Sequence, residues 1–308
     1  MNISYIGELA AFGTALCWTF GSQFFEAAGK RVGTLSVNMI RLVLALFLFI
    51  ILSLFTNGNL FPVNFPLHAW IWLGLSGLIG FALGDLFLFK AFVEIGPRLS
   101  MLIMTLTAPI SALLGLTFLG EIYSLQQWFG MLITLSGVSW VILERSNNNQ
   151  KNKKRKIRQV TKSGIIYAFL GTLGQATGYV LSKYGMMVNN DYLEPFAATQ
   201  IRVIVGTIGF MIIITLNRSW PKVIIAIKNI NAMGFMMGGA ILGPFLGVSL
   251  SLLALHYITA GVASTITALV PILIIPSVMF IGKEHVSIRA FGGAIVAVAG
   301  VFLLFMKF

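Results

Sequence analysis

The stretch GFALGDLFLFKAF at residues 80–92 has a second copy, GPFLGVSLSLLAL, at residues 243–255. Both copies contain the spacing Gly-xxx-Gly, and both have the composition of a membrane-spanning helix. The first copy, however, also carries Asp85 and Lys90. An ionised side chain near the middle of a bilayer costs about 3 kcal/mol on insertion scales, so these two charges require partners that compensate for the loss of water.

The overall composition is that of an integral membrane protein. Of the 308 residues, 57% are hydrophobic and only 10% are charged, a balance outside the range of soluble domains. The single cysteine, Cys17, has no partner for a disulfide bond. The net charge of +12 does not indicate nucleic-acid binding, because eight of the 21 basic residues lie between Arg145 and Lys162. Such a polar, basic linker is typical of a segment beside anionic lipid head groups.

Ten apolar stretches of about 20 residues each predict ten transmembrane helices. They cover residues 5–28, 35–56, 69–92, 99–119, 125–144, 163–187, 196–216, 233–256, 262–282 and 287–307. The basic linker divides them into five and five. The spacings Ser124-x-x-Gln127 and Asp191-x-x-Glu194 predict capping boxes at the start of two of these helices.

The two groups of five are copies of one pattern. LTAPISALLGLTFLGE at residues 106–121 matches ALVPILIIPSVMFIGKE at residues 268–284. The equivalent pairs include Pro109 with Pro271, Glu121 with Glu284, Arg41 with Arg202, and Gly21 with Gly178. Because each copy has an odd number of spans, the second copy must enter the membrane upside down relative to the first.

We therefore predict an all-α integral membrane protein, with ten transmembrane helices arranged as two five-helix inverted-topology repeats around a central cavity. The first repeat is expected at residues 1–144, the basic linker at 145–162 and the second repeat at 163–308. A complete pair of repeats makes a monomer sufficient for function, and the sequence leaves an oligomer open.

Residues 100–142 and 263–305 carry a family resemblance. Each resembles the second part of an EamA domain, with its central Pro, a Gly-(x)-Glu helix end and a Gly-rich last span. The tandem pair is similar to ten-helix carriers of the drug/metabolite transporter superfamily. The resemblance implies a secondary transporter in the plasma (inner) membrane of a bacterium, commonly an exporter of amino acids or other small metabolites.

The function predicted on this basis is export of small metabolites, with amino acids as the first choice, by alternating access of a central site. The alternatives are a carrier of drugs or lipophilic cations, a carrier of nucleotides or sugars with the same fold, and a channel-like facilitator. We expect neither enzyme activity nor a cofactor, because no nucleophile with a base, paired carboxylates or phosphate loop stands at a workable spacing. His68, His256 and His285 have no metal-ligand spacing, so no metal site is expected.

Two arguments about the orientation in the membrane disagree, one from the distribution of basic residues and one from the family resemblance. The connections on the linker side contain sixteen basic residues, namely Lys30, Arg31, Arg98, Arg218, Lys222, Lys228, Lys283, Arg289 and the eight of the linker. The opposite side contains only Lys183 and Lys307. The positive-inside rule therefore places the linker in the cytoplasm and both termini outside, whereas relatives in bacteria usually have both termini inside.

A charge cluster is expected on the linker side of the membrane. Asp85 lies about 10 Å from the end of its predicted span, and Arg41 lies about as far inside the antiparallel second span, so the two can form an ion pair. Glu26 occupies the same layer, and Lys90 can extend to the interface. The cluster either holds helices together or serves a substrate site or proton relay. The second interpretation is favoured by asymmetry, because Asp85 aligns with Val248 in the second copy.

Asp85 is also the candidate for proton coupling, although a carboxylate held by Arg41 would exchange protons poorly. The candidates for substrate contact lie in the first and sixth spans and are Trp18, Ser22, Gln23, Gln175, Thr177 and Tyr179. Their polar groups suit a small amphipathic solute, and the alternative is that they only bond neighbouring helices. Pro109 and Pro271 are expected to kink their helices, either as gating elements or as static bends.

Overall fold

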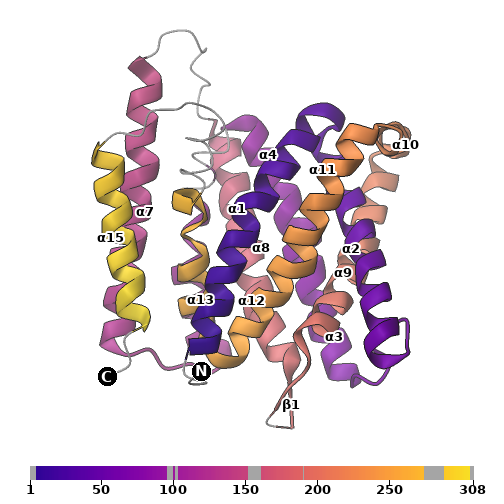
Figure 1. Ribbon diagram of the computed structural model, residues 1–308, viewed down its shortest axis with the longest axis horizontal. Coiled ribbons are helices and arrows are strands. Elements are labelled where there is room, and N and C mark those ends of the chain that lie inside the picture. Colours follow the sequence, from indigo (N-terminus) through magenta and orange to yellow (C-terminus); the bar gives the residue numbers. More distant parts are fainter. Residues whose placement is uncertain are drawn as a thin grey trace.

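The computed structural model describes residues 5–95, 100, 103–151, 161–189, 191–273 and 288–305, most of which are helical (Figure 1). In chain order the helical elements are α1 (Ile6–Val32), α2 (Thr34–Asn57), α3 (Leu67–Gly77), η2 (Leu78–Gly84), α4 (Asp85–Glu94), α6 (Thr107–Phe118), α7 (Leu125–Lys151), α8 (Lys162–Met186), α9 (Pro195–Leu216), α10 (Trp220–Ile227), α11 (Ile230–Ala240), η3 (Ile241–Phe245), α12 (Leu246–Tyr257), α13 (Ala260–Thr267) and α15 (Ile288–Phe305). A short β-hairpin with two residues in each strand, β1 (Met187–Val188) and β2 (Asp191–Tyr192), connects α8 to α9.

Each of the ten predicted spans overlaps one or more of these helices. Among the described residues, five helical stretches are long and apolar enough to cross a membrane, namely Thr34–Thr56, Leu67–Ala91, Lys162–Met186, Pro195–Leu216 and Ile230–Tyr257. Three shorter apolar helices cover Thr107–Phe118, Ala260–Leu273 and Phe291–Phe305. The number of ten crossings and the inverted repeats stay predictions.

Local sequence chemistry determines where the helices begin. The first predicted capping box is present at the start of α7: the Ser124 hydroxyl accepts from the Gln127 N–H at 3.2 Å, and the Gln127 side chain accepts from the Ser124 N–H at 2.9 Å. The second predicted box is wrong. Glu194 is itself the N-cap of α9, and its carboxylate accepts from two backbone N–H groups at 2.6 and 2.9 Å, while Asp191 lies in β2. A carboxylate at this position satisfies N–H groups that have no partner within the helix.

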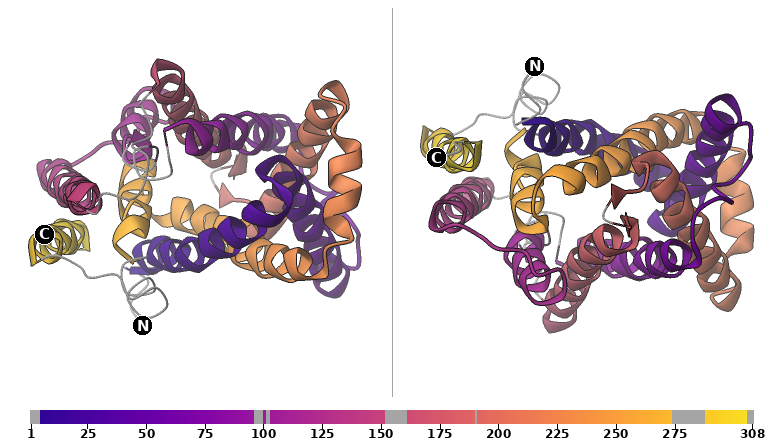
Figure 2. Two further views of the ribbon diagram at one scale, coloured as in Figure 1. Left: turned by 90° about the horizontal axis from the view of Figure 1, so that it is seen from above. Right: turned by 90° about the horizontal axis from the view of Figure 1, so that it is seen from below.

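The contacts between the two sequence halves are repeated in a corresponding way. α1 packs against α11 and α12, and α8 packs in the same way against α3 and α4. The same correspondence pairs α2 with α9, α6 with α13, and α7 with α15. Figure 2 shows α7 and α15 together at one edge of the molecule.

The first helices of the two halves run in opposite senses. A side chain at Gly7, near the start of α1, would contact Ile258, and Lys183, near the end of α8, donates a hydrogen bond to the Ile258 carbonyl. The start of α1 and the end of α8 therefore lie at the same end of the molecule, which is the end that carries the β-hairpin (Figure 1). We call this the hairpin end and the opposite one, where α10 lies, the basic end.

The Gly-xxx-Gly stretch of the first copy lies within a π-helix, and that of the second copy begins in one and ends in α12. η2 and η3 interrupt the third and eighth predicted spans at equivalent places. The glycines lie where helices of the two halves approach closely: a Cβ at Gly84 would lie 3.2 Å from Nε2 of Gln175 on α8, and a Cβ at Gly247 would lie 2.7 Å from the indole of Trp18 on α1. These glycines therefore act as packing contacts.

Substitution of a glycine at this contact is expected to destabilise the fold. A Cβ at Gly178 of α8 would lie 3.2 Å from Cα of Gly80, so Gly178→Leu should lower the free energy of unfolding by about 1–3 kcal/mol. The matched control is Gly234→Leu on α11, where a Cβ would contact nothing within 4 Å. The control should be neutral or slightly stabilising in thermal denaturation of the protein in detergent micelles, and equal losses in the two variants would contradict the close approach.

Candidate functional site

A buried acidic side chain, Asp85, joins three helices. It is the first residue of α4 and is 7% exposed. Its Oδ2 accepts a hydrogen bond from Nη2 of Arg41 on α2, and its Oδ1 accepts one from Nε2 of Gln175 on α8 at 2.9 Å. α2 and α4 belong to the first half of the sequence and α8 to the second. The network therefore connects the halves through ionic and polar contacts in the interior.

The π-helical segment positions this network. η2 ends directly before Asp85, and the carbonyl oxygen of Gly80 accepts both the Asp85 N–H and Nε2 of Gln175, the latter at 3.1 Å. Gln175 reaches this carbonyl because the helices approach closely, with a Cβ at Gly174 only 2.8 Å from Cα of Gly84. Single π-helical turns of this kind often occur at functional sites.

Aromatic rings cover the guanidinium group of Arg41. Its Cζ lies 5.1 Å from the ring centre of Phe25 and 5.7 Å from that of Phe89. Contacts of a cation with ring faces gain strength when water is excluded. They therefore offset part of the cost of burying this cation.

Arg202 on α9, the residue equivalent to Arg41, lies in a different environment. It is 3% exposed, and its Cζ lies 4.8 Å from the ring centre of Phe81 in η2. Its Nε and Nη1 are buried and have no hydrogen-bond partner in the described part of the chain. Asp85 and Tyr179 lie within electrostatic range of this guanidinium.

Tyr179 stands one turn after Gln175 on α8 and is 5% exposed. Its hydroxyl makes no hydrogen bond of ordinary geometry to the described residues, and the hydroxyl groups of Ser251 on α12 and Thr267 on α13 lie beside it. These polar side chains lie together in the interior. We call them the central cluster, which consists of Arg41, Asp85, Gln175, Tyr179 and Arg202.

The other residues predicted to contact substrate lie outside this cluster. Trp18 is half-buried against Gly247. Ser22 is exposed and Gln23 is half-buried, and both donate to the Thr19 carbonyl of their own helix at 3.1 Å. Thr177 is half-buried. Thr177 follows Gln175 by two residues, which places it on nearly the opposite face of α8.

One member of the predicted charge cluster, Lys90, is not part of the network. Lys90 is exposed, and its Nζ lies 5.9 and 5.4 Å from the ring centres of Phe87 and Tyr167. Five residues separate it from Asp85, so it leaves α4 on another face. The side chain of Glu26, like Glu284, lies outside the described part of the structure.

A second ionic network lies at the hairpin end, and the sequence did not predict it. Lys183 donates to Glu121 Oε1 at 2.7 Å, and Tyr123 donates to Glu121 Oε2 at 2.6 Å. The same carboxylate accepts from the backbone N–H of Ala260 at 3.1 Å, the first residue of α13. Burial and the adjacent carboxylate raise the pKa of Tyr123, so its hydroxyl stays protonated and remains a donor. The only signals in the sequence were the helix-end glutamate and a lysine within an apolar span.

Both prolines stand beside interruptions in their helices. Residues 105–106 form a turn directly before α6, in which Pro109 is the third residue, and residues 268–269 form a turn two residues before Pro271. A proline lacks the N–H of the helical ladder, so a neighbouring carbonyl is released from it. The two breaks occupy nearly equivalent positions in the two halves.

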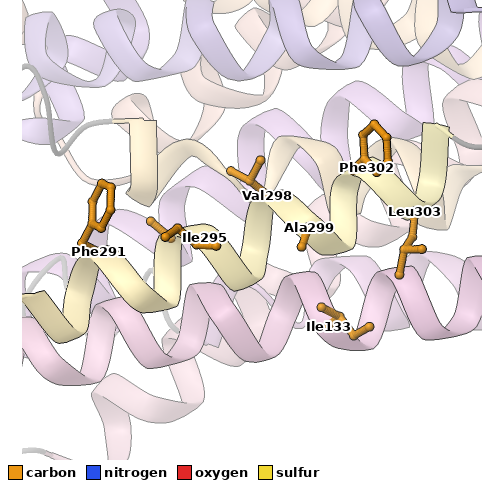
Figure 3. A pocket seen from close by; sticks show the side chains of 8 residues that line it. Ile133, Phe291, Ile295, Val298, Ala299, Phe302 and Leu303 are labelled. Carbon is orange, nitrogen blue, oxygen red and sulfur yellow. The ribbon is translucent and has the colours of Figure 1, made fainter.

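Two surface hollows lie away from the central cluster. A groove of about 710 Å³ between α7 and α15 is lined only by apolar side chains, among them Ile133, Phe291 and Phe302 (Figure 3). Its exposed apolar lining suits contact with lipid tails. A hollow of about 240 Å³ at the basic end is lined by Arg31 and Lys222 with four other residues. Within the described ranges, no group of three or more His, Cys, Asp and Glu side chains could hold a metal ion.

Comparison with known proteins gives one family and one fold. The sequence model of the EamA-like transporter family matches residues 5–143 and again residues 162–306. A solved structure described as "Crystal structure of protein" has a TM-score of 0.73, with 15% sequence identity over 97% of this chain and 95% of that chain. At this identity the likeness concerns the fold alone. No curated protein matches the sequence.

Loss of one partner of the buried ion pair is expected to cost more than loss of both. Asp85→Asn leaves the Arg41 guanidinium buried without a counter-ion, so it should lower the free energy of unfolding by about 3–5 kcal/mol. The double variant Arg41→Gln/Asp85→Asn should recover a large part of that loss, which a double-mutant cycle by chemical denaturation in micelles measures. Strictly additive losses would contradict a direct pair. Lys228→Gln, an exposed charge at the basic end, is the control.

The hairpin-end network gives a second stability prediction. Glu121→Gln should lower the melting temperature clearly, because the nearly buried Lys183 loses its carboxylate. Glu194→Gln is the matched control, since Glu194 is an exposed carboxylate that only caps α9, and a loss of about 1 kcal/mol or less is expected there. If the control loses as much as Glu121→Gln, the Lys183 contact is not stabilising.

Proposed function

Because the chain belongs to the EamA-like transporter family, we propose that it is a secondary-active carrier of small metabolites with one central site. The observation that supports this most is the central cluster, in which Arg41, Asp85 and Gln175 are bonded together and Arg202 and Tyr179 lie beside them. Ionisable residues inside a membrane are costly and typically mark the path of a substrate or ion.

The carrier works by alternating access of this site between two inverted repeats. In this proposal residues 1–144 and 163–308 are the repeats and 145–162 is the linker. The opposite senses of α1 and α8 and the pairing of equivalent helices support it. In transporters built this way, one repeat rocks against the other around a fixed site near the middle of the membrane.

The hairpin-end network acts as one gate. Lys183 of α8 and the first turn of α13 are held by Glu121 of the other half. Lys183 follows Gln175 by eight residues on α8, which is about 12 Å along the helix axis. Solute can pass from the central cluster to the hairpin end only when these contacts open. The helix breaks beside Pro109 and Pro271 are the proposed points of bending.

The proposed solutes are amino acids or similar small metabolites, and the proposed direction is export across the plasma membrane of a bacterium. The excess of basic residues at the basic end supports an orientation in which the hairpin end faces outside. Asp85 is the proposed group for proton coupling, with Arg41 and Gln175 as the donors that hold its ionised form.

Counterflow in proteoliposomes tests this function. Vesicles loaded with an unlabelled amino-acid mixture should accumulate the labelled mixture transiently, and uptake should saturate and depend on the internal solute. Asp85→Asn and Gln175→Ala should each reduce the rate at least about tenfold, because each removes a charge-assisted hydrogen bond at the site. Lys228→Gln should transport normally.

Linear flux without trans-stimulation would indicate a channel. Normal transport with unchanged pH dependence in both Asp85→Asn and Gln175→Ala would place the site elsewhere in the molecule.

A further inference from the structure

The two repeat-related arginines differ in how their charge is balanced. Arg41 donates to the carboxylate of Asp85. Arg202 has neither an ion pair nor a hydrogen bond for its Nε and Nη1 in the described part of the chain, although it is the more deeply buried of the two. The reason is visible in the sequence, because the position equivalent to Asp85 in the second half is occupied by Val248.

Asp85 makes no direct bond to Arg202 in the described part of the structure. Its Oδ2 bonds Arg41 and its Oδ1 bonds Gln175, and its effect on Arg202 is electrostatic only. The central cluster therefore contains two guanidinium cations and one carboxylate. A buried cation without a counter-ion is costly, and each buried donor without an acceptor adds to that cost.

We propose that Arg202 binds the carboxylate of the transported solute. This carboxylate would be the counter-ion of Arg202, as Asp85 is the counter-ion of Arg41. This rests on the proposed carrier function and names the substrate class of the same site. The surroundings fit an organic acid anion. The Tyr179 hydroxyl, which makes no hydrogen bond of ordinary geometry to the described residues, can donate to a carboxylate oxygen, and the ring of Phe81 offers an apolar surface beside the guanidinium.

The charge balance selects a monoanionic group. One unpaired guanidinium matches one negative charge, and a guanidinium is well suited to a planar carboxylate. A dianionic phosphate would face repulsion from Asp85, which lies within electrostatic range of Arg202. A cationic solute would be repelled by Arg202 itself. Monocarboxylates, including the carboxylate of a zwitterionic amino acid, are therefore the class we assign.

The first test requires no ligand. Arg202→Gln should leave the melting temperature of the ligand-free protein unchanged or raise it, because the variant removes an uncompensated buried charge. Arg41→Gln, the repeat-related control, should lower it, because Asp85 then loses its cation. If Arg202→Gln destabilises the protein as much as Arg41→Gln does, Arg202 has a structural counter-ion and the proposal is wrong.

The second test uses matched ligands. A thermal-shift titration of the purified protein compares amino acids and aliphatic or aromatic monocarboxylates with their amides, with the corresponding amines and with organic phosphates. Monocarboxylates should raise the melting temperature, and their amides and amines should not. Arg202→Gln should weaken binding of the best carboxylate at least about tenfold. Arg202→Lys, which keeps the charge without the planar fork, should give an intermediate value.

The proposal is overturned if amides or amines bind as well as the acids, if phosphates alone bind, if no carboxylate binds, or if Arg202→Gln binds carboxylates normally. Its failure is distinguishable from failure of the carrier function. Saturable, trans-stimulated counterflow of a cationic solute would support the carrier function and contradict the anion site. Carboxylate binding that depends on Arg202, without trans-stimulation in vesicles, would support the anion site and contradict the carrier function.

Discussion

A carboxylate stays ionised in the interior of a membrane protein only where donors replace the water that it has lost. For Asp85 these donors come from two helices of different sequence halves: Arg41 on α2 and Gln175 on α8. Aromatic rings then shield the cation of the pair. The packing of α2, α4 and α8 around one point follows from this requirement, since each helix supplies one member of the bonded group.

Close approach of helices makes such a group possible. Within a bilayer, helices gain little from burying apolar surface against each other, so van der Waals contact between small residues and interhelical hydrogen bonds decide their packing. Gly84 and Gly174 allow the backbones of η2 and α8 to meet, and the π-helical winding of η2 directs the Gly80 carbonyl to a side chain of the partner helix. The second copy uses the same winding at η3, where Trp18 of α1 fills the contact.

The sequence predicted those features that depend on depth and on local chemistry. The depth of Arg41 and Asp85 in antiparallel spans predicted their pairing, and the Ser124 capping box follows from spacing alone. The sequence could not predict the direction in which each helix faces, and for that reason it placed Lys90 in the charge cluster, although its side chain is exposed. Contacts between distant segments, such as Glu121 with Lys183, depend on the packed arrangement of several helices. α10 and the β-hairpin were missed because a window of about 20 residues averages over elements so short.

The amide group of Gln175 has a fixed polarity in this structure. Both hydrogen bonds that the structure gives to its nitrogen are donated, one to the Gly80 carbonyl and one to Asp85, and an amide nitrogen has two hydrogens. Turning the amide by half a revolution would bring its oxygen against two other oxygens, so this orientation is excluded on electrostatic grounds. The oxygen of Gln175 can therefore only accept, whereas the guanidinium of Arg202 can only donate. A solute bound at the proposed site would therefore meet an acceptor on α8 and donors on α9, and this difference would orient its two ends before any apolar contact formed.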